Sequence, residues 1–292
     1  MIDGSVTLMP RHILTFSCPD VAGIQAAVTT ALFNSGAFLE EVASHGHPET
    51  QTFFSRIVFS PARDKAVDPR SVEADFKSIA DQFAMTWRIS DAARKCRTLI
   101  AVSRSGHCLN DLLHRWSSGT LPIEVAGVVS NHDELRHTVE WHGLPFHHLP
   151  VAPGEGAKQE AAFVSIIEQA NVDLVVLARY MRILSDSAAA KLAGRCINIH
   201  HSFLPGFKGA KAYHQAHARG VKIIGATAHY VTGDLDEGPI IEQGVERVDH
   251  AASAEDLVEI GRDIENTVLA RAVKWHAERR VLLNGQRTIV FR

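Results

Sequence analysis

The distribution of apolar residues divides the chain into two regions with different patterns. In the first ninety residues, short apolar runs alternate with two amphipathic segments, in the order strand, helix, strand, strand, helix, strand. Strands are expected at 12–18, 37–44, 52–59 and 86–89, and helices at 24–34 and 69–83. In the second helix, Phe76, Ile79 and Phe83 share one face. This order predicts a ferredoxin-like βαββαβ domain over residues 1–90.

The pattern changes after a polar linker at residues 91–96. From residue 97 to 292, continuous apolar runs are separated by helical segments. Strands are expected at 98–102, 125–129, 173–178, 197–200, 223–231 and 287–291, and helices at 109–116, 131–142, 161–170 and 256–280. Apolar strands that alternate with helices indicate a mostly parallel sheet covered on both faces. The second domain is therefore predicted to be a doubly wound α/β domain.

Composition and charge exclude several classes of function. The net charge is −3 and no run of Lys or Arg stands out, so we expect neither nucleic-acid binding nor membrane-surface binding. No apolar run approaches the roughly 18 residues of a membrane span, and no signal peptide is visible. The four cysteines are scattered without a Cys-x-x-Cys pair, which indicates reduced thiols. We expect a cytoplasmic protein.

Motifs for common cofactors are missing. Residues 103–108, after the first strand of the second domain, hold one glycine, so they match neither a dinucleotide fingerprint nor a phosphate-binding P-loop. The 17 histidines include no His-Glu-x-x-His motif and no Cys/His cluster with metal-ligand spacing. We expect neither a cofactor nor a metal.

Three polar residues carry the strongest chemical signal. Asn198 and His200 are two apart at the end of a predicted strand, so their side chains point to the same side, and Asp236 follows 36 residues later. An amide donor, an imidazole and a carboxylate can stabilise an oxyanion and move a proton. Each residue also has a simpler explanation: a turn asparagine, a hydrogen-bonded core histidine and an acidic surface turn.

The spacing of these three residues, with Leu204-Pro205 and Asp236-Glu237-Gly238 around them, resembles the folate-dependent formyltransferase family over about residues 97–248. The resemblance implies that Asn198, His200 and Asp236 are catalytic and lie beside the formyl group of 10-formyltetrahydrofolate. It also implies that the segments 179–184 and 229–234 hold the pterin ring. The implied substrate-binding residues are Met181, Arg182, Ile183, Leu184, His229, Val231 and Asp234.

Members of this family pass the formyl group to glycinamide ribonucleotide, to methionyl-tRNA or to water. Arg104, His107 and Cys108 stand where the ribonucleotide enzymes have a glycine-rich phosphate loop, and we count them among the substrate-binding residues. The whole chain is similar to the deformylases of the family, which hydrolyse 10-formyltetrahydrofolate to formate and tetrahydrofolate in one-carbon and purine metabolism. Two alternatives stay open: transfer to a small amine, and a catalytically silent folate- or amino-acid-binding protein.

The loop at residues 18–24 and the helix after it look like an ACT domain, a regulatory module that often binds amino acids. The resemblance implies a homo-oligomer and a possible amino-acid effector near Asp20 and Gly23. Gly23 near a helix start allows a charged ligand to approach backbone amides. The alternative is a capping aspartate followed by a turn glycine.

Overall fold

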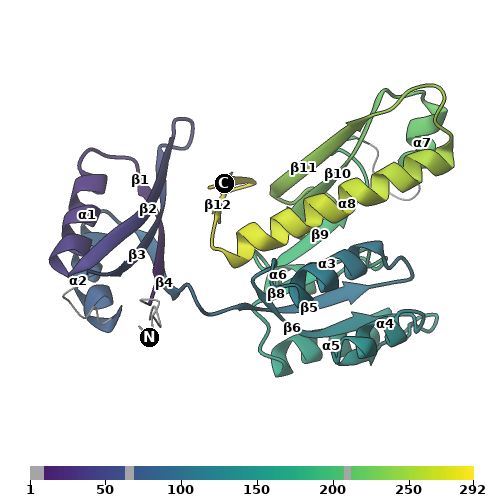
Figure 1. Cartoon of the computed structure of the whole chain (residues 1–292), viewed down its shortest axis with the longest axis horizontal. Helices are drawn as coiled ribbons and strands as arrows, with labels where there is room; N and C mark the ends of the chain where they lie inside the picture. Colours follow the sequence, from purple (N-terminus) through teal and green to yellow (C-terminus); the bar gives the residue numbers. More distant parts are fainter. Residues whose placement is uncertain (1–9, 63–68, 207–211) are drawn as a thin grey trace, which may run out of the picture. The chain divides into compact units, whose positions relative to one another are not determined.

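A computed structural model of the chain describes residues 10–62, 69–206 and 212–292, and it contains two compact units. The first unit extends to Arg94 and also includes Glu278–Leu282 and Phe291–Arg292. The second unit comprises Lys95–Ala277 and Leu283–Val290 (Figure 1). In the described part of the chain, no helix is long and apolar enough to cross a membrane.

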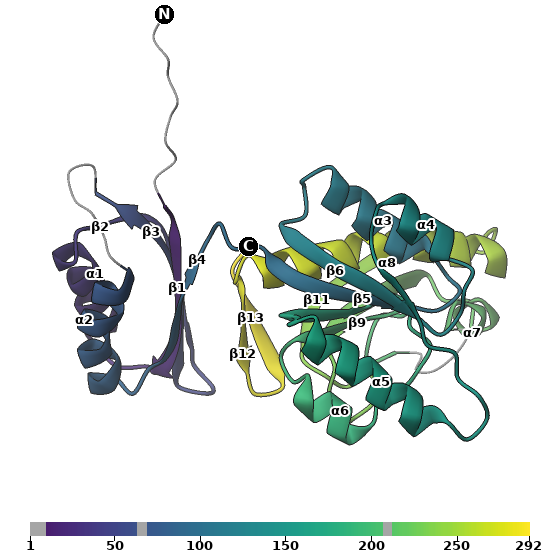
Figure 2. The ribbon, with the colours of Figure 1, turned by 90° about the horizontal axis from the view of Figure 1, so that it is seen from below.

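The first unit is a four-stranded antiparallel sheet with the strand order β2-β3-β1-β4. Its strands are β1 (His12–Pro19), β2 (Ala37–His47), β3 (Thr52–Pro61) and β4 (Thr86–Asp91). Helices α1 (Ile24–Asn34) and α2 (Pro69–Gln82) cover one face of the sheet (Figure 2). Phe16, Phe59 and Phe76 are almost fully buried between the helices and the sheet. The predicted ferredoxin-like fold is confirmed.

The second unit contains a seven-stranded sheet with the order β11-β10-β9-β8-β5-β6-β7. Its strands are β5 (Cys96–Val102), β6 (Ile123–Ser130), β7 (Phe146–His148), β8 (Leu174–Leu177), β9 (Cys196–His200), β10 (Ile223–Tyr230) and β11 (Ile240–Arg247). Strands β5 to β9 are parallel, whereas β10 runs antiparallel to both of its neighbours. The mostly parallel sheet that the sequence predicted is confirmed.

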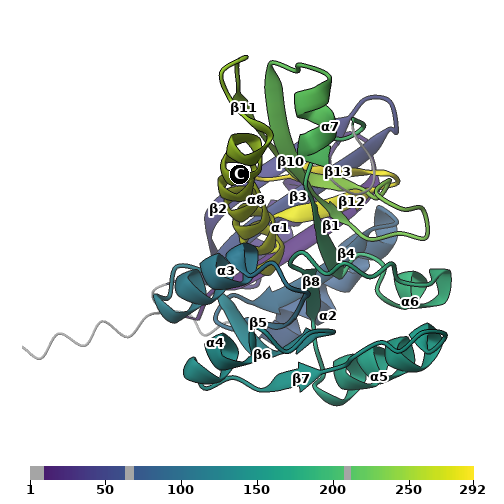
Figure 3. The same ribbon diagram turned by 90° about the vertical axis from the view of Figure 1, so that its right-hand side faces the viewer.

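Helices cover both faces of this sheet. Helices α3, α4 and α8 lie on one face, and α5 and α6 lie on the other (Figures 2 and 3). The helices are α3 (His107–Ser117), α4 (Arg136–Trp141), α5 (Gly156–Gln169), α6 (Asp186–Lys191), α7 (Ala212–Ala218) and α8 (Ala254–Ala277). Strands β12 (Val281–Asn284) and β13 (Arg287–Val290) form a separate pair.

Several parts of the pattern were misread. The helix expected over 131–142 is limited to α4, because the residues before it form turns in which the Arg136 amide donates to the Asp133 carbonyl at 3.0 Å. Strand β11 was missed because its second half is exposed and polar, so neither an apolar run nor a clear alternation marks it. The three-residue strand β7 and the short helix α6 were also missed.

The strand order places several strand ends side by side. Strand β5 has β6 on one side and β8 on the other, so the order of the strands along the chain reverses at β5, and ligands bind beyond the carboxyl ends of strands at such a point. Leu177 at the end of β8 is in register with Asn198 of β9. Because β10 is antiparallel to β9, it places His229 opposite Asn198.

Candidate active site

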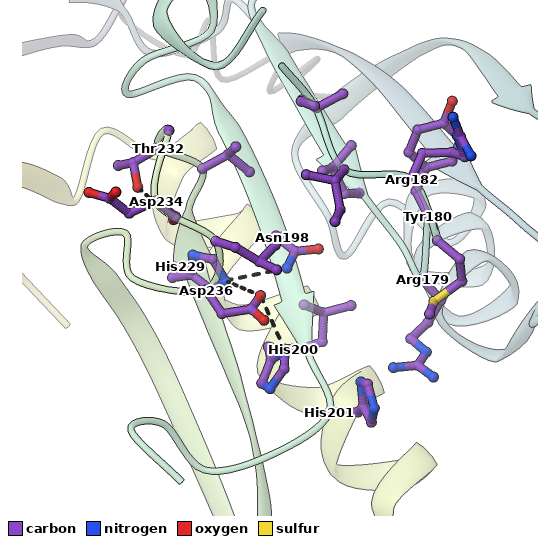
Figure 4. Close-up of a pocket in the computed structure, with 18 residues that line it drawn as sticks. Arg179, Tyr180, Arg182, Asn198, His200, His201, His229, Thr232, Asp234 and Asp236 are labelled. Atoms are coloured by element: carbon purple, nitrogen blue, oxygen red, sulfur yellow. Dashed lines mark hydrogen bonds and ion pairs between the residues drawn. The ribbon is translucent and has the colours of Figure 1, made fainter. Parts of the chain in front are cut away.

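A cavity of about 270 Å³ lies beyond the carboxyl ends of β8 and β9, and we call it the reaction cavity (Figure 4). All three predicted catalytic residues line it, together with most of the predicted substrate-binding residues. The predicted residues that line it are Met181, Arg182, Ile183, Leu184, Asn198, His200, His229, Val231, Asp234 and Asp236. Arg179, Tyr180, His201 and Thr232 are among its other lining residues.

The Asn198 amide is oriented by a neighbouring histidine. The Nδ2 of Asn198 lies 3.3 Å from Nε2 of His229, and the Nδ1 of His229 lies 2.9 Å from the Tyr230 carbonyl oxygen. A carbonyl oxygen only accepts hydrogen bonds, so Nδ1 carries the hydrogen and Nε2 accepts from the Asn198 amide. Burial lowers the pKa of His229, although the Tyr230 carbonyl and Asp236 oppose this shift. His229 is therefore a neutral acceptor that fixes Asn198.

Asp236 lies between two histidines. Its Oδ1 atom is 3.3 Å from His200 Nδ1 and 3.8 Å from His229 Nε2, and its side chain is 8% exposed. Burial by itself would raise the pKa of Asp236, but the hydrogen bond and the charge of His200, with a smaller contribution from His229, hold the pKa below its usual value. The carboxylate is therefore ionised and lies against the His200 imidazole.

The loop between β10 and β11 holds Asp236 in a specific conformation. Asp236 has a φ of +58°, a left-handed conformation in which aspartate is several-fold enriched among non-glycine residues. The amide of Tyr230 donates to the Pro239 carbonyl at 2.9 Å and closes the loop. A Cβ atom on Gly238 would lie 1.7 Å from the Tyr230 carbonyl oxygen. This close contact explains physically why a glycine follows the Asp236-Glu237 pair.

The segment after β8 forms the opposite wall of the cavity. Met181 and Ile183 are 58% and 73% exposed, which makes an apolar rim at the entrance. The Met181 amide donates to Ser103 Oγ at 2.9 Å, and Gln159 Nε2 donates to the Tyr180 hydroxyl at 2.6 Å, so the backbone of this wall is fixed. The Nε of Arg182 is buried with no hydrogen-bond partner among the described residues.

The other three predicted substrate-binding residues lie outside the reaction cavity. Arg104 is exposed and forms an ion pair with Glu134 at 3.1 Å. Cys108 is 1% exposed and lines neither the reaction cavity nor its neighbour. His107 lines a second cavity of about 310 Å³, which shares Arg179, Met181 and His201 with the first. We call this second space the acceptor-side cavity.

Sequence reasoning missed Glu265, a charged residue in the acceptor-side cavity. Glu265 is 1% exposed and lies on the buried face of α8, in line with Leu257, Gly261 and Val268. Its carboxylate is 2.8 Å from His107 Nε2, 2.9 Å from the Tyr213 hydroxyl and 3.4 Å from Arg179 Nε. A glutamate on the apolar face of an amphipathic helix is a signal that the sequence did contain.

Among the described residues, His107, Cys108 and Glu265 form a group whose ligand atoms lie within 4.8 Å of one another. Burial, with the charge of Glu265, raises the pKa of the Cys108 thiol well above its usual value, so the sulfur is protonated. The charge of Glu265 is already matched by Arg179 and His107. Through Glu265 the group also belongs to an ion-pair network with Arg179.

The residues predicted to bind an effector lie in the first unit, before α1. Gly23 has a φ of +93° at the start of α1, a conformation that favours glycine, and no side chain caps the helix. The carboxylate of Asp20 lies against Gly46, where a Cβ atom would be 2.4 Å from Asp20 Oδ2. Asp20 therefore packs against β2 and does not cap α1.

Comparison with known proteins yields one consistent result. The family described as formyl transferase matches residues 96–273. A formyltetrahydrofolate deformylase of Corynebacterium sp. (strain P-1) is 49% identical over 283 residues, which is 97% of this chain and 98% of that protein. Two crystal structures of formyltetrahydrofolate deformylases are also similar. The Burkholderia mallei enzyme is 52% identical with a TM-score of 0.92, over 97% of this chain and 100% of that one. The Pseudomonas syringae enzyme is 45% identical with a TM-score of 0.94, over 99% and 96%.

Proposed function

The chain belongs to the formyltetrahydrofolate deformylase family, whose members are hydrolases, and we propose that it hydrolyses 10-formyltetrahydrofolate in the reaction cavity through Asn198, His200 and Asp236. The observation that carries this assignment of roles is the contact of Asp236 with His200 beside a fixed asparagine amide. This arrangement places an oxyanion donor and a proton acceptor in one buried space, as hydrolysis of a formyl amide requires.

The formyl group is an amide, and its hydrolysis requires attack by water on the carbonyl carbon. The water oxygen bonds to the formyl carbon, and the water gives a proton to Asp236. Negative charge develops on the formyl oxygen, where the Asn198 amide and the His200 imidazole stabilise it. The C–N10 bond then breaks, N10 takes the proton, and formate and tetrahydrofolate are the products. One proton of the water thus reaches N10 by way of Asp236, and the other is released to solvent when formic acid ionises to formate.

The placement of the three groups supports these roles. Asn198 and Asp236 approach the same histidine, His229, so the oxyanion donor and the proton acceptor are held a short distance apart. Burial of the site lowers the local dielectric, and fixed donors stabilise a developing charge more strongly there than in water. Because His229 is a neutral acceptor, it directs the Asn198 amide without adding a competing charge.

The walls of the cavity support a role in folate binding. The backbone of residues 179–184 and the loop 229–234 lie on opposite sides of the cavity, as the binding of a flat pterin ring requires. Met181 and Ile183 form an apolar rim for the rest of the substrate, and the buried Nε of Arg182 is a donor for an anionic group. His229, Val231 and Asp234 belong to the facing loop.

The first unit is proposed to be a regulatory and oligomerisation domain. Its ferredoxin-like fold and the left-handed Gly23 before α1 support an amino-acid effector near Asp20 and Gly23. The proposal includes a homo-oligomer in the cytoplasm. Calorimetric titration with glycine and with methionine tests the effector, because heat of binding for neither would reduce this unit to an assembly domain.

The test of the function is the release of formate and tetrahydrofolate from 10-formyltetrahydrofolate by the purified protein with no added amine. We expect repeated turnover with equal amounts of both products. Folate binding without turnover, followed by turnover when an amine is added, would replace hydrolysis with transfer to that amine. Folate binding without turnover under any of these conditions would indicate a binding protein.

A further inference from the structure

The acceptor-side cavity contains a buried carboxylate that lies next to the reaction cavity. Glu265 lines it together with Arg179, His107 and Tyr213, and Arg179 also lines the reaction cavity. Arg179 follows β8, so its guanidinium lies where the two cavities meet. Arg179 is thus one of three residues, with Met181 and His201, that line both cavities.

Glu265 is a natural binding group for an amine, because a buried carboxylate beside an accessible space attracts a cation. In this chain the cation is supplied internally. Arg179 Nε lies 3.4 Å from Oε2 of Glu265, and His107 Nε2 lies 2.8 Å from the same oxygen. The Tyr213 hydroxyl donates to the other oxygen at 2.9 Å. Both oxygens of the carboxylate are therefore occupied.

The backbone of Arg179 is in an unusual conformation that holds the side chain there. Its φ is +63°, in the left-handed region that favours glycine and that a long side chain rarely adopts. Such strain persists only where the surrounding structure maintains it, and it collects at functional sites. Here the Ser103 amide donates to the Arg179 carbonyl at 3.3 Å, and Glu265 holds the guanidinium.

We propose that Arg179 sets the acceptor specificity of the enzyme: its guanidinium occupies the position beside Glu265 that the ammonium group of an amine acceptor would take, so that water is left as the acceptor. The charge of Arg179 repels an approaching ammonium group, whereas it has no such effect on neutral water. This proposal rests on the proposed function, since it names what distinguishes hydrolysis from transfer in the same site.

The test is the partition of the formyl group in the variant Arg179→Gly, whose glycine also suits the left-handed backbone. Glycinamide is the probe, because it is a small primary amine with an α-amino pKa of about 8. Bound beside Glu265 and deprotonated, its nitrogen bonds to the formyl carbon, the C–N10 bond breaks, and the amine proton moves by way of Asp236 to N10. We expect N-formylglycinamide to rise roughly tenfold or more over wild type, and to saturate with amine concentration.

Three comparison variants separate charge at Glu265 from a general opening of the cavity. Arg179→Lys keeps the positive charge and should still give formate. Arg262→Ala removes an exposed arginine from the same cavity, with no contact to Glu265 in the described structure, and should also give formate. Arg179→Gly/Glu265→Gln should lose saturable amine transfer. Millimolar guanidinium chloride should return Arg179→Gly to hydrolysis by refilling the vacated position.

The outcomes distinguish this inference from the proposed function. A wild-type protein that releases no formate refutes the proposed function and this inference with it. Formate release by wild type, with no N-formylglycinamide from folded Arg179→Gly, refutes the inference alone. The variant is purified with guanidinium chloride, which is removed before the assay, and Arg179→Met is measured in the same way if the glycine variant does not fold. N-formylglycinamide that is independent of Glu265 would also refute it.

Discussion

Two buried carboxylates of the second unit, Asp236 and Glu265, differ in the partners that surround them. Asp236 lies 3.3 Å from His200 Nδ1, with the neutral His229 3.8 Å away, whereas Glu265 is paired with His107, Tyr213 and Arg179. An imidazole can gain and lose a proton near neutral pH, but an arginine cannot lose its proton in a protein. The first carboxylate is therefore suited to proton transfer with His200, whereas the second has, besides the His107 imidazole, a partner that stays charged.

The two carboxylates also differ in the elements that carry them. Asp236 lies on a loop, which positions a reactive group by a few backbone contacts, and Glu265 lies in the middle of a 24-residue helix. Substitutions should accordingly affect rate at the first site and stability at the second.

The substitution Glu265→Gln should destabilise the protein more than it impairs chemistry. Removal of one partner from a buried ion pair leaves the other charge uncompensated, which typically costs about 3–5 kcal/mol. Arg179, with a side chain 17% exposed, would be the uncompensated charge. Urea denaturation measures the change in the free energy of unfolding. Glu259→Gln, an exposed position on the same helix, is the control and should change stability little.

The substitution Asp236→Asn should impair the chemical step more than it lowers stability. It keeps the shape of the side chain and removes the proton acceptor, and we expect kcat to fall roughly 100- to 1000-fold while folate binding is kept. His200→Ala should have a loss of similar size. The adjacent, exposed Glu237→Gln is the control. Wild-type turnover in either site variant would contradict the proposed mechanism.

Protonation of His201 should weaken the fold in acid. Burial, with the charges of Arg179 and His200, lowers the pKa of His201 from 6.5 to about 4. Between these two pH values the unfolded state binds the proton and the folded state does not, so the free energy of unfolding falls as pH falls through this window. The contribution is roughly 3 kcal/mol over the window.

The variant His201→Gln measures this contribution. Its stability, followed by denaturation from pH 7 to pH 4, should decline less steeply than that of wild type, because the titrating group is gone. His217→Gln on the exposed side of α7 serves as the control and should keep the wild-type slope. An unchanged slope in His201→Gln would show that other groups dominate the acid sensitivity.

Substitution of two glycines should change rate or stability less. Gly238 lies in the Asp236 loop, and Gly261 lies on the same face of α8 as Glu265. A Cβ on Gly238 would lie 1.7 Å from the Tyr230 carbonyl oxygen, and one on Gly261 would lie 2.2 Å from the Tyr213 ring. Gly261→Ala should lower stability by about 1–3 kcal/mol through overpacking. Gly238→Ala should shift the Asp236 loop and lower kcat by up to about 100-fold. If each of the two variants lowered both stability and kcat, the proposed difference between a rate-determining Asp236 site and a stabilising Glu265 site would be contradicted.

Local pattern was sufficient for most of the architecture. The apolar periodicity predicted α1 with its correct ends and placed β1, β3 and β9 within two residues, because each segment buries one continuous face. Asn198 and His200 were placed on one side of a strand by their spacing alone. The identification of Asp236 depended on resemblance, since an acidic turn by itself does not indicate chemistry.

Only the tertiary structure decided which groups meet. His107 and Glu265 are 158 residues apart, and no local signal predicts that α3 and α8 place them 2.8 Å from each other. The same holds for the contact between Arg179 and Glu265, which joins the segment after β8 to α8. Periodicity reports which face of an element is buried, whereas the pairing of charges depends on the order and direction of strands across the sheet. The sequence therefore determined most of the elements and the candidate residues, and the fold determined which partners each carboxylate meets.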